Sequence, residues 1–241
     1  MPAERIANGL FRVLKGYVNA YLLEDAGGPV LIDCGLPKRA DRIADAIRET
    51  GRRPEDVRHI LLTHHHLDHT GSLAVLAART GAAVYVHPAD APVVSGASMP
   101  PPPNRAKLSG RTLGPLLVRI GPKRADPAKV DRELVNGEEL PFAGGVRVVH
   151  TPGHTAGQTS FLLPREGGIL IAGDAARAVG TRVGPPVGAV FGMFTEDLAE
   201  AKRSFRKLAE LDFEVAVFGH GNPIRSGAAD AFRRAAARLP S

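Results

Sequence analysis

The sequence contains little cysteine, few aromatic residues and no long apolar segment. Its one cysteine, Cys34, leaves the 241 residues without an internal disulfide, which favours a reducing compartment such as the cytoplasm. No stretch approaches the roughly 20 apolar residues that a membrane span needs, and the N-terminal residues lack the apolar region of a secretory signal. Aromatic residues make up 5% of the chain, which leaves few platforms for stacking nucleic-acid bases. We therefore expect a cytoplasmic protein without a membrane span.

The composition is that of a globular protein large enough for a substantial core. Apolar residues make up 44% of the chain and charged residues 23%. The net charge of +6 and the isoelectric point near 9.8 are compatible with an acidic partner, but most basic residues are dispersed among acidic ones. No linker or low-complexity segment divides the chain, so we expect a single domain spanning residues 1–241.

One segment, at about residues 96–128, breaks the regular pattern and is predicted to be an insert. It opens with a proline run that excludes a helix or a central strand. It then combines apolar residues with Arg111, Arg119 and other basic residues, with few acidic neighbours. We expect a basic, proline-rich loop that covers the substrate, with Arg111 and Arg119 as candidate substrate contacts. A contact between two copies of the chain and a membrane-surface patch are the alternatives.

Apolar periodicity predicts alternating strands and helices on both sides of the insert. Before it, we expect strands at residues 10–14, 18–23, 30–33, 60–62 and 83–86, with helices at 38–50 and from about 70 to 81. After it, we expect strands at 145–150, 159–163, 168–172 and 214–218, a helix that begins with Thr195 as its N-cap, and a last helix near the C-terminus. This alternation is typical of α/β proteins. The apolar strands that end at Asp33 and Asp174 echo each other, which indicates two related halves.

The most informative segment follows the apolar run at residues 60–62. It places His64, His66, Asp68 and His69 within six residues. A strand that ends at this point would present all four side chains on one loop at the edge of a sheet. Imidazole and carboxylate groups hold zinc and related divalent ions. The segment therefore predicts a metal site.

Later segments place the same kinds of side chain directly after other apolar strands. They are His154, Asp174 and His220. Each histidine has a glycine beside it, so each alone would be an ordinary turn residue. Recurrence at four strand ends instead favours one shared site. Asp33 also ends a strand, where it either faces this site or forms a turn.

The combined pattern resembles that of the metallo-β-lactamase-fold hydrolases over essentially the whole chain. The resemblance implies an α/β fold, a four-layer αββα sandwich of two mixed sheets with outer helices, and two metal ions at one edge. It implies that the first ion is held by His64, His66 and His154, and the second by Asp68, His69 and His220. It further implies that Asp174 bridges both ions and that Asp33 supports the ligands from behind.

The resemblance also implies the chemistry, which is hydrolysis by a hydroxide shared between the two ions. Asp68 and Asp174 are the residues expected to be catalytic, Asp68 by orienting the nucleophile. No serine or cysteine nucleophile is needed, so Cys34 is expected to pack in the core. The donor set favours zinc but also suits iron or manganese. The remaining histidines are expected to have no ligand role: His59, His65, His87 and His150.

Two branches of the family share much of the pattern and suggest the substrate. The glyoxalase II-like thioesterases share the segment from Thr63 to Gly71, although the basic C-terminal region here matches theirs poorly. The acyl-homoserine lactonases are similar in size, but they carry a tyrosine shortly after the bridging aspartate. Here Asp174 is followed by two alanines and Arg177, which either contacts an acidic substrate group or has no role. We expect a small carbonyl substrate, either an ester, a lactone or a thioester.

Two other activities use related sites. An RNase Z-like phosphodiesterase or nuclease shares the ligand set, and the basic insert would suit phosphates. The low aromatic content and the lack of an extended RNA-binding arm make nucleic acid an unexpected partner. A mononuclear iron persulfide dioxygenase shares part of the motif, but His69 and His220 favour two ions. The oligomeric state, a homodimer included, stays open.

Overall fold

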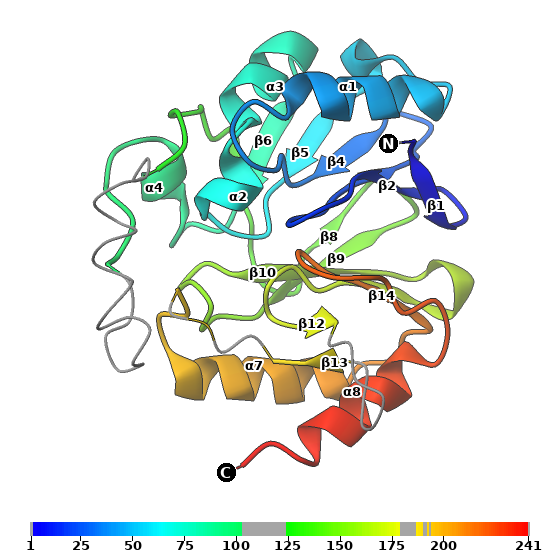
Figure 1. Ribbon diagram of the computed structural model, residues 1–241, viewed down its shortest axis with the longest axis vertical. Coiled ribbons are helices and arrows are strands. Elements are labelled where there is room, and N and C mark those ends of the chain that lie inside the picture. The colour runs from blue at the N-terminus through cyan, green and yellow to red at the C-terminus, as the bar shows by residue number, and fades with distance from the viewer. Residues whose placement is uncertain (1, 103–123, 179–186, 190–191, 193, 241) are drawn as a thin grey trace.

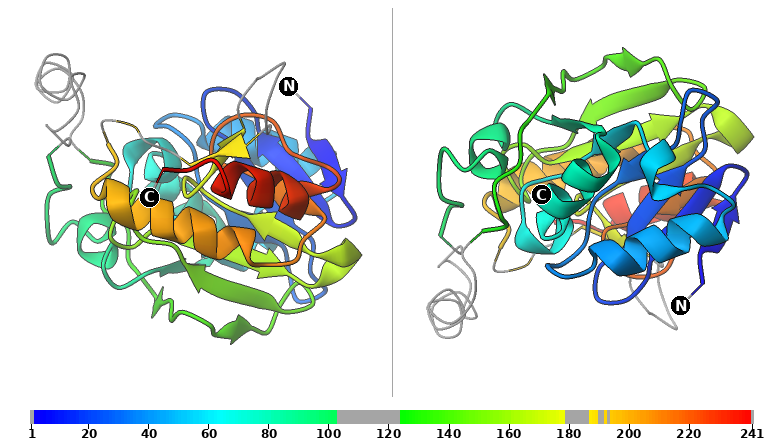
Figure 2. Two further views of the ribbon diagram at one scale, coloured as in Figure 1. Left: turned by 90° about the horizontal axis from the view of Figure 1, so that it is seen from below. Right: turned by 90° about the horizontal axis from the view of Figure 1, so that it is seen from above.

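Two β-sheets lie face to face between two outer layers of helices (Figure 1). The computed structural model describes residues 2–102, 124–178, 187–189, 192 and 194–240. Helices α1 (Ala40–Glu49) and α3 (Leu73–Thr80) cover one sheet, and α7 (Leu198–Ala209) and α8 (Ala228–Ala236) cover the other, as Figure 2 shows from both sides. The four-layer αββα sandwich predicted from the sequence is confirmed.

The first sheet contains seven strands in the order of the sequence. Neighbours from β1 to β4 are antiparallel, whereas neighbours from β4 to β7 are parallel. Helices α1 and α3 make the crossovers that parallel pairing requires. The strands are β1 (Glu4–Ala7), β2 (Leu10–Leu14), β3 (Ala20–Leu23), β4 (Val30–Ile32), β5 (His59–Leu61), β6 (Ala83–Val86) and β7 (Arg132–Glu133).

The second sheet contains five strands in the order β14, β11, β10, β9, β8. Only β11 and β14 pair in parallel, with α7 between them along the chain. The strands are β8 (Glu139–Leu140), β9 (Val146–His150), β10 (Thr159–Leu163), β11 (Ile169–Ile171) and β14 (Val215–Val217), and a separate pair is β12 (Arg177–Ala178) with β13 (Val187–Gly188). Short helical turns are α2 (Leu67–Thr70), α4 (Ala91–Val94), η1 (Pro54–Asp56) and η2 (Arg165–Gly167).

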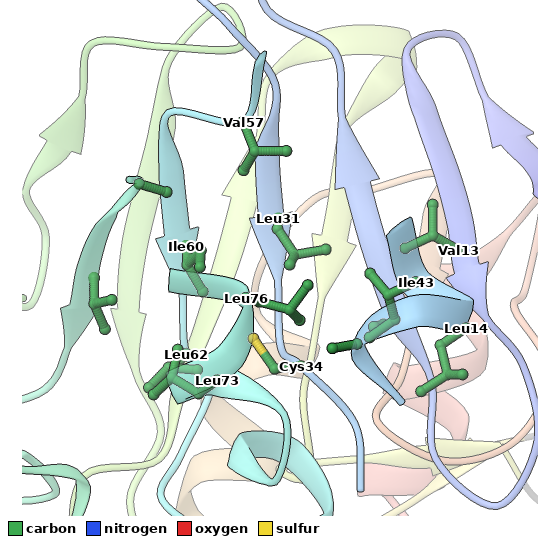
Figure 3. Close-up of a cluster of buried hydrophobic side chains, with 14 of the residues drawn as sticks. Val13, Leu14, Leu31, Cys34, Ile43, Val57, Ile60, Leu62, Leu73 and Leu76 are labelled. Carbon is green, nitrogen blue, oxygen red and sulfur yellow. The ribbon is translucent and has the colours of Figure 1, made fainter. Parts of the chain in front are cut away.

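Three apolar cores join the four layers. The first lies between the seven-stranded sheet and its helices, where Ile43 and Leu76 pack over Leu31 (Figure 3). Cys34 is fully buried in this core, and burial raises the pKa of its thiol well above the usual value. The cysteine therefore packs as a small apolar residue, as expected.

The second core lies between the two sheets. The third lies between the five-stranded sheet and helices α7 and α8. Phe161 of β10 is fully buried in the second. In the third, Phe205 of α7 stacks on Phe232 of α8 with ring centroids 5.1 Å apart. These buried aromatic rings fix both helices against the sheet.

The echo between the strands that end at Asp33 and Asp174 has a structural counterpart. Strand β4 is antiparallel to β3 and, after α1, parallel to β5. Strand β11 is likewise antiparallel to β10 and, after α7, parallel to β14. The two halves of the chain thus repeat one unit of three strands and a helix.

The helix that was expected to begin at Thr195 begins later. Its first residue is Leu198, and the side chain of Asp197 accepts a hydrogen bond of 2.9 Å from the backbone nitrogen of Glu200. Asp197 is therefore the N-cap. The expectation that Thr195 is the N-cap was wrong. Its hydroxyl faces His154 instead, 3.4 Å from Nδ1.

The ends of the predicted insert lie together. Arg124 donates a hydrogen bond of 2.8 Å to the carbonyl oxygen of Gly96. Arg111 and Arg119 lie outside the described residues. Within the described ranges, no helix combines the length and the apolar character that crossing a membrane requires.

Candidate metal centre

The histidine-rich segment continues from β5 through a short extended loop into helix α2. His64 and His66 lie on the loop, whereas Asp68 and His69 lie in α2, which was not predicted. The hydroxyl of Thr70 donates to the carbonyl oxygen of His66 at 3.0 Å and closes this single turn. The loop and the turn therefore direct four side chains toward one place.

The other three predicted ligands follow β9, β11 and β14 in the second sheet. His154 lies between β9 and β10, Asp174 lies three residues after β11, and His220 lies three residues after β14. Their side chains meet those of the histidine-rich segment beyond the ends of these strands, at one edge of the sandwich. All seven residues predicted from the sequence are thus brought together.

Their ligand atoms form three overlapping groups in which all atoms lie within 4.8 Å of one another. Two of these groups are the two sets that the sequence pattern implied, and Asp174 belongs to the group between them. The groups are His64, His66 and His154; His64, His69 and Asp174; and Asp68, His69 and His220.

Asp174 occupies the middle of the centre. Its Oδ2 lies 3.4 Å from Nε2 of His154 and 3.3 Å from Nε2 of His220, and its Oδ1 lies 3.6 Å from Nε2 of His69. Nε2 of His220 also lies 3.3 Å from Oδ2 of Asp68. One carboxylate therefore faces His154 of the first ligand group as well as His69 and His220 of the last group.

Four of the histidines use Nδ1 for contacts outside the centre, which leaves Nε2 for the centre. For His64 the partner of Nδ1 is the hydroxyl of Thr63 at 3.0 Å. For His220 it is the carbonyl oxygen of Tyr17 at 2.5 Å. His69 and His154 follow the same rule, with Asp33 and Thr195 as partners. Such contacts set the tautomer and the orientation of a ligand imidazole.

Asp33 connects several of these groups from behind. Its Oδ2 lies 2.8 Å from Nδ1 of His69 and accepts a hydrogen bond of 2.8 Å from the hydroxyl of Thr63. Its Oδ1 accepts from the backbone nitrogen of Thr63 at 2.9 Å. Asp33 therefore faces the centre, and its turn-forming alternative does not account for these contacts.

A divalent cation fits the donor set of this centre. Nε2 of His64, Nε2 of His69 and Oδ1 of Asp174 are buried and have no hydrogen-bond partner among the described residues. Buried polar atoms are rarely left unpaired. Nitrogen and carboxylate oxygen donors gathered in this way match the ligands that hold zinc and related ions.

The electrostatics divide the histidines into two classes. Burial, followed by the neighbouring imidazoles, lowers the pKa of His64 well below its usual value. Burial likewise lowers the pKa values of His66 and His154. These three rings are therefore neutral at pH 7, which is the form that binds metal ions.

His69 and His220 behave in the opposite way. Burial disfavours the charge of His69, but Asp33, Asp68 and Asp174 raise its pKa to about 9. Burial also disfavours the charge of His220, but contacts with Asp174 and Asp68 raise its pKa to about 11.

The carboxylates respond to these positive charges. Burial raises the pKa of Asp68, but His69 and His220 lower it to about 2. The same two histidines hold the pKa of Asp174 far below its usual range against the effect of burial. Both carboxylates are ionised at neutral pH, and the centre attracts positive charge.

A glycine allows the last strand to approach the centre. A Cβ atom on Gly219 would lie 2.1 Å from Oδ1 of Asp174 and 2.6 Å from Cε1 of His69. Any larger residue would displace the carboxylate or the ring. The glycine beside His220 thus allows close approach as well as forming a turn.

Other residues singled out from the sequence lie away from the centre. Arg177 is exposed in β12, and among the described residues no contact joins it to the centre. His59 stacks on Phe142, and His87 stacks on His150, which gives these three histidines structural surroundings. His65 is buried, and its Nδ1 lies 3.1 Å from Asp90.

Several residues at the centre were missed in the sequence. They are Thr63, Asp90, Thr195, Asn19 and Tyr17. Asp90 follows the carboxyl end of β6, as the ligands follow other strands, but no residue near it in the sequence indicates its partners. Asn19 and Tyr17 precede a strand and carried no comparable signal.

The comparisons with known proteins agree with this geometry. The model of the metallo-beta-lactamase superfamily matches residues 13–220. The probable metallo-hydrolase YflN of Bacillus subtilis is 30% identical over 93% of this chain and 91% of its own length. A hydroxyacylglutathione hydrolase of Cereibacter sphaeroides is 30% identical over 82% of this chain and 60% of its own.

A solved structure shows the same fold. The S60 mutant of a metallo-β-lactamase of Cronobacter sakazakii with a HARLDQ motif superposes with a TM-score of 0.72 at 24% identity. The match covers 92% of this chain and 79% of that one. The chain therefore belongs to the metallo-β-lactamase superfamily and is a metal-dependent hydrolase.

Proposed function

We propose that the chain hydrolyses a small ester, lactone or thioester at a centre that holds two divalent metal ions, with zinc as the metal. One ion would be held by His64, His66 and His154. The other would be held by Asp68, His69 and His220, and Asp174 would contact both. The observation that carries this proposal is the set of buried, unpaired ligand atoms around Asp174.

Bound ions would supply water activated near neutral pH and polarisation of the substrate carbonyl. Asp33, Thr63 and the carbonyl of Tyr17 hold the imidazoles so that each Nε2 faces the centre. The side chain of Asp68 is 21% exposed, against 5% for Asp174. Because its pKa is about 2, Asp68 is ionised and can orient a water at the open side by accepting its hydrogen bond.

The hydroxyacylglutathione hydrolase relative supports a thioester, and the resemblance to the acyl-homoserine lactonases in size and motif supports a lactone. The chain has Ala175 and Ala176 after Asp174, so an assisting tyrosine is absent from that position. Arg177, Arg111 and Arg119 remain predicted contacts for an acidic substrate group. The single domain of residues 1–241 and the cytoplasmic location remain predictions as well.

Metal content and substrate preference test the proposal together. We expect about two metal ions per purified chain and carbonyl hydrolysis that a chelator abolishes. Lactone, thioester and phosphodiester substrates should be compared in the same buffer, with and without the chelator. Cleavage of the phosphodiester alone would overturn the proposal in favour of a nuclease. One iron per chain without hydrolysis would overturn it in favour of a dioxygenase.

A further inference from the structure

The carboxylate of Asp90 binds two loops beside the metal centre and does not cap helix α4. It occupies the N-cap position of α4, where an aspartate usually accepts a hydrogen bond from the first turn, yet its side chain makes no such bond. Instead, Oδ2 accepts from the backbone nitrogen of His65 at 2.9 Å and from the hydroxyl of Thr155 at 2.8 Å. Oδ1 accepts from the backbone nitrogen of Gly157 at 2.8 Å. Both oxygens are therefore used across two loops.

Those two loops carry one half of the centre, the ligand group of His64, His66 and His154. The other half is the group of Asp68, His69 and His220. His65 lies between His64 and His66, and Thr155 directly follows His154. Asp90 therefore fixes the distance between a loop of the first sheet and a loop of the second. A Cβ atom on residue 157 would lie 2.5 Å from Oδ1 of Asp90, so this close approach requires glycine.

Asn19 makes the corresponding connection for the other half of the centre. Its Nδ2 donates to the carbonyl oxygens of Phe218 at 3.0 Å and Gly221 at 2.8 Å. Its backbone nitrogen donates to the carbonyl oxygen of Gly219 at 2.8 Å. These three carbonyl groups lie on both sides of His220 in the sequence. Asn19, directly before β3 of the first sheet, therefore fixes the loop that presents His220.

Both residues are too deeply buried to contact a substrate. Asp90 and Asn19 are each 1% exposed. Neither belongs to any of the ligand groups. Their shared feature is that each lies just outside a strand of the seven-stranded sheet and contacts a ligand-bearing loop of the five-stranded sheet. Loss of either side chain would leave buried backbone groups unpaired and free the loop to move.

We propose that Asp90 and Asn19 are positioning residues, each of which sets the metal affinity of one half of the centre. Asp90 serves the half that contains His154, and Asn19 serves the half that contains His220. The inference rests on the proposed function, because it assumes that both halves bind metal. It predicts that the two affinities can be weakened one at a time.

The test is a zinc titration of metal-stripped protein in competition with a chromophoric chelator, which yields a dissociation constant for each half. We expect Asp90→Asn to weaken one constant about 10-fold, the lower end of the effect of removing a direct partner of a ligand, because Asp90 holds residues beside the ligands. Asn19→Leu should weaken the other constant by a similar factor. His154→Ala and His220→Ala identify which constant belongs to which half.

Asp25 provides a matched control. Its Oδ1 accepts a hydrogen bond of 2.8 Å from the backbone nitrogen of Ala143, so it also joins the two sheets. It follows the far end of β3, away from Asn19 and from the centre. Asp25→Asn should therefore leave both zinc constants unchanged, although it replaces one of the two accepting carboxylate oxygens.

A milder pair of variants covers the case in which Asp90→Asn does not fold. Thr155→Val removes one hydroxyl donor to Asp90, and Thr155→Ser retains it. The valine variant should weaken only the half with His154, and the serine variant should restore it.

Three results would overturn the inference: wild-type constants in Asp90→Asn and Thr155→Val, equal weakening of both halves, or the same effect from Asp25→Asn. A wild-type chain that takes up no zinc would instead refute the proposed function.

Discussion

Oδ2 of Asp33 lies 2.8 Å from Nδ1 of His69, and this contact directs the other ring nitrogen of His69 toward Asp174. Asp33 adopts a φ angle of 60°, in the left-handed region that residues other than glycine rarely occupy. The strained backbone conformation is maintained by three contacts with Thr63 and His69. We therefore predict that Asp33 serves the centre rather than the turn.

Asp33→Asn tests this relationship. The amide has nearly the same shape but lacks the negative charge that helps to raise the pKa of His69. We expect zinc affinity and kcat/KM to fall about 10-fold to 100-fold while the melting temperature of the folded chain changes little. The measurements are a zinc titration and steady-state kinetics. Wild-type values for both would show that Asp33 is only a turn residue.

Asp174→Ala and His154→Ala test the assignment of the centre itself. Asp174 contacts histidines of both halves, and His154 completes the first ligand group. We expect either variant to lose turnover because the centre loses a donor, while circular dichroism still reports a folded chain. The variant Asp25→Asn, which lies away from the centre, should keep its activity. Near wild-type turnover in either alanine variant would contradict the assignment.

The outline of the fold could be predicted because its signals are local. Apolar runs marked the strands, and the spacing from His64 to His69 marked the centre. Helix α2 could not be predicted, since a four-residue turn lacks a periodic pattern of its own. A Cβ on Gly71, its C-cap residue, would lie 2.3 Å from Pro37, so this turn packs directly against a distant segment.

The residues that support the ligands were hidden for a related reason. The partners of Asp90 lie 25, 65 and 67 residues away along the chain. Nothing near Asp90 in the sequence indicates such partners, and its position before a short helix suggests a local cap instead. Thr195 was assigned to a cap on the same local argument, whereas the structure places it beside His154.

Metal uptake should release protons from the centre. The pKa values of His69 and His220 are raised to about 9 and about 11, so both rings are protonated at pH 7.5. Metal ions bind the neutral rings, and uptake should therefore release roughly two protons per chain from these rings, besides one from a water that the ions would activate. His64, His66 and His154 should release none, because burial lowers their pKa values. Calorimetric titrations in buffers of different ionisation enthalpy measure this number.

The sign of the pH dependence follows from the same values. A raised pKa favours the protonated ring, so protons compete with the metal more strongly at lower pH. Zinc affinity should therefore rise with pH between 7 and 9 and gain less beyond the pKa of His69, about 9. His220→Ala should release about one proton fewer than the wild type. Zinc binding without proton release, or with the same release in His220→Ala, would contradict this assignment of charge.

Tyr17 is predicted to contact the substrate at the rim of the centre. Its ring is 74% exposed and meets the ring of His220 edge-on, with centroids 5.0 Å apart. On another side, Phe194 is 45% exposed and lies 6.1 Å from the ring of His66. Exposed aromatic rings beside a buried polar centre favour apolar substrate groups.

Tyr17→Ala should raise KM for a substrate with a long acyl chain about fivefold, which corresponds to about 1 kcal/mol of lost apolar contact. It should leave kcat unchanged, because the carbonyl oxygen that accepts from His220 belongs to the backbone. Tyr17→Phe is the matched control, since it keeps the ring and removes only the hydroxyl. If the phenylalanine variant instead loses kcat with KM unchanged, the hydroxyl assists the reacting carbonyl, and Tyr17 takes the role that a tyrosine after Asp174 would otherwise fill.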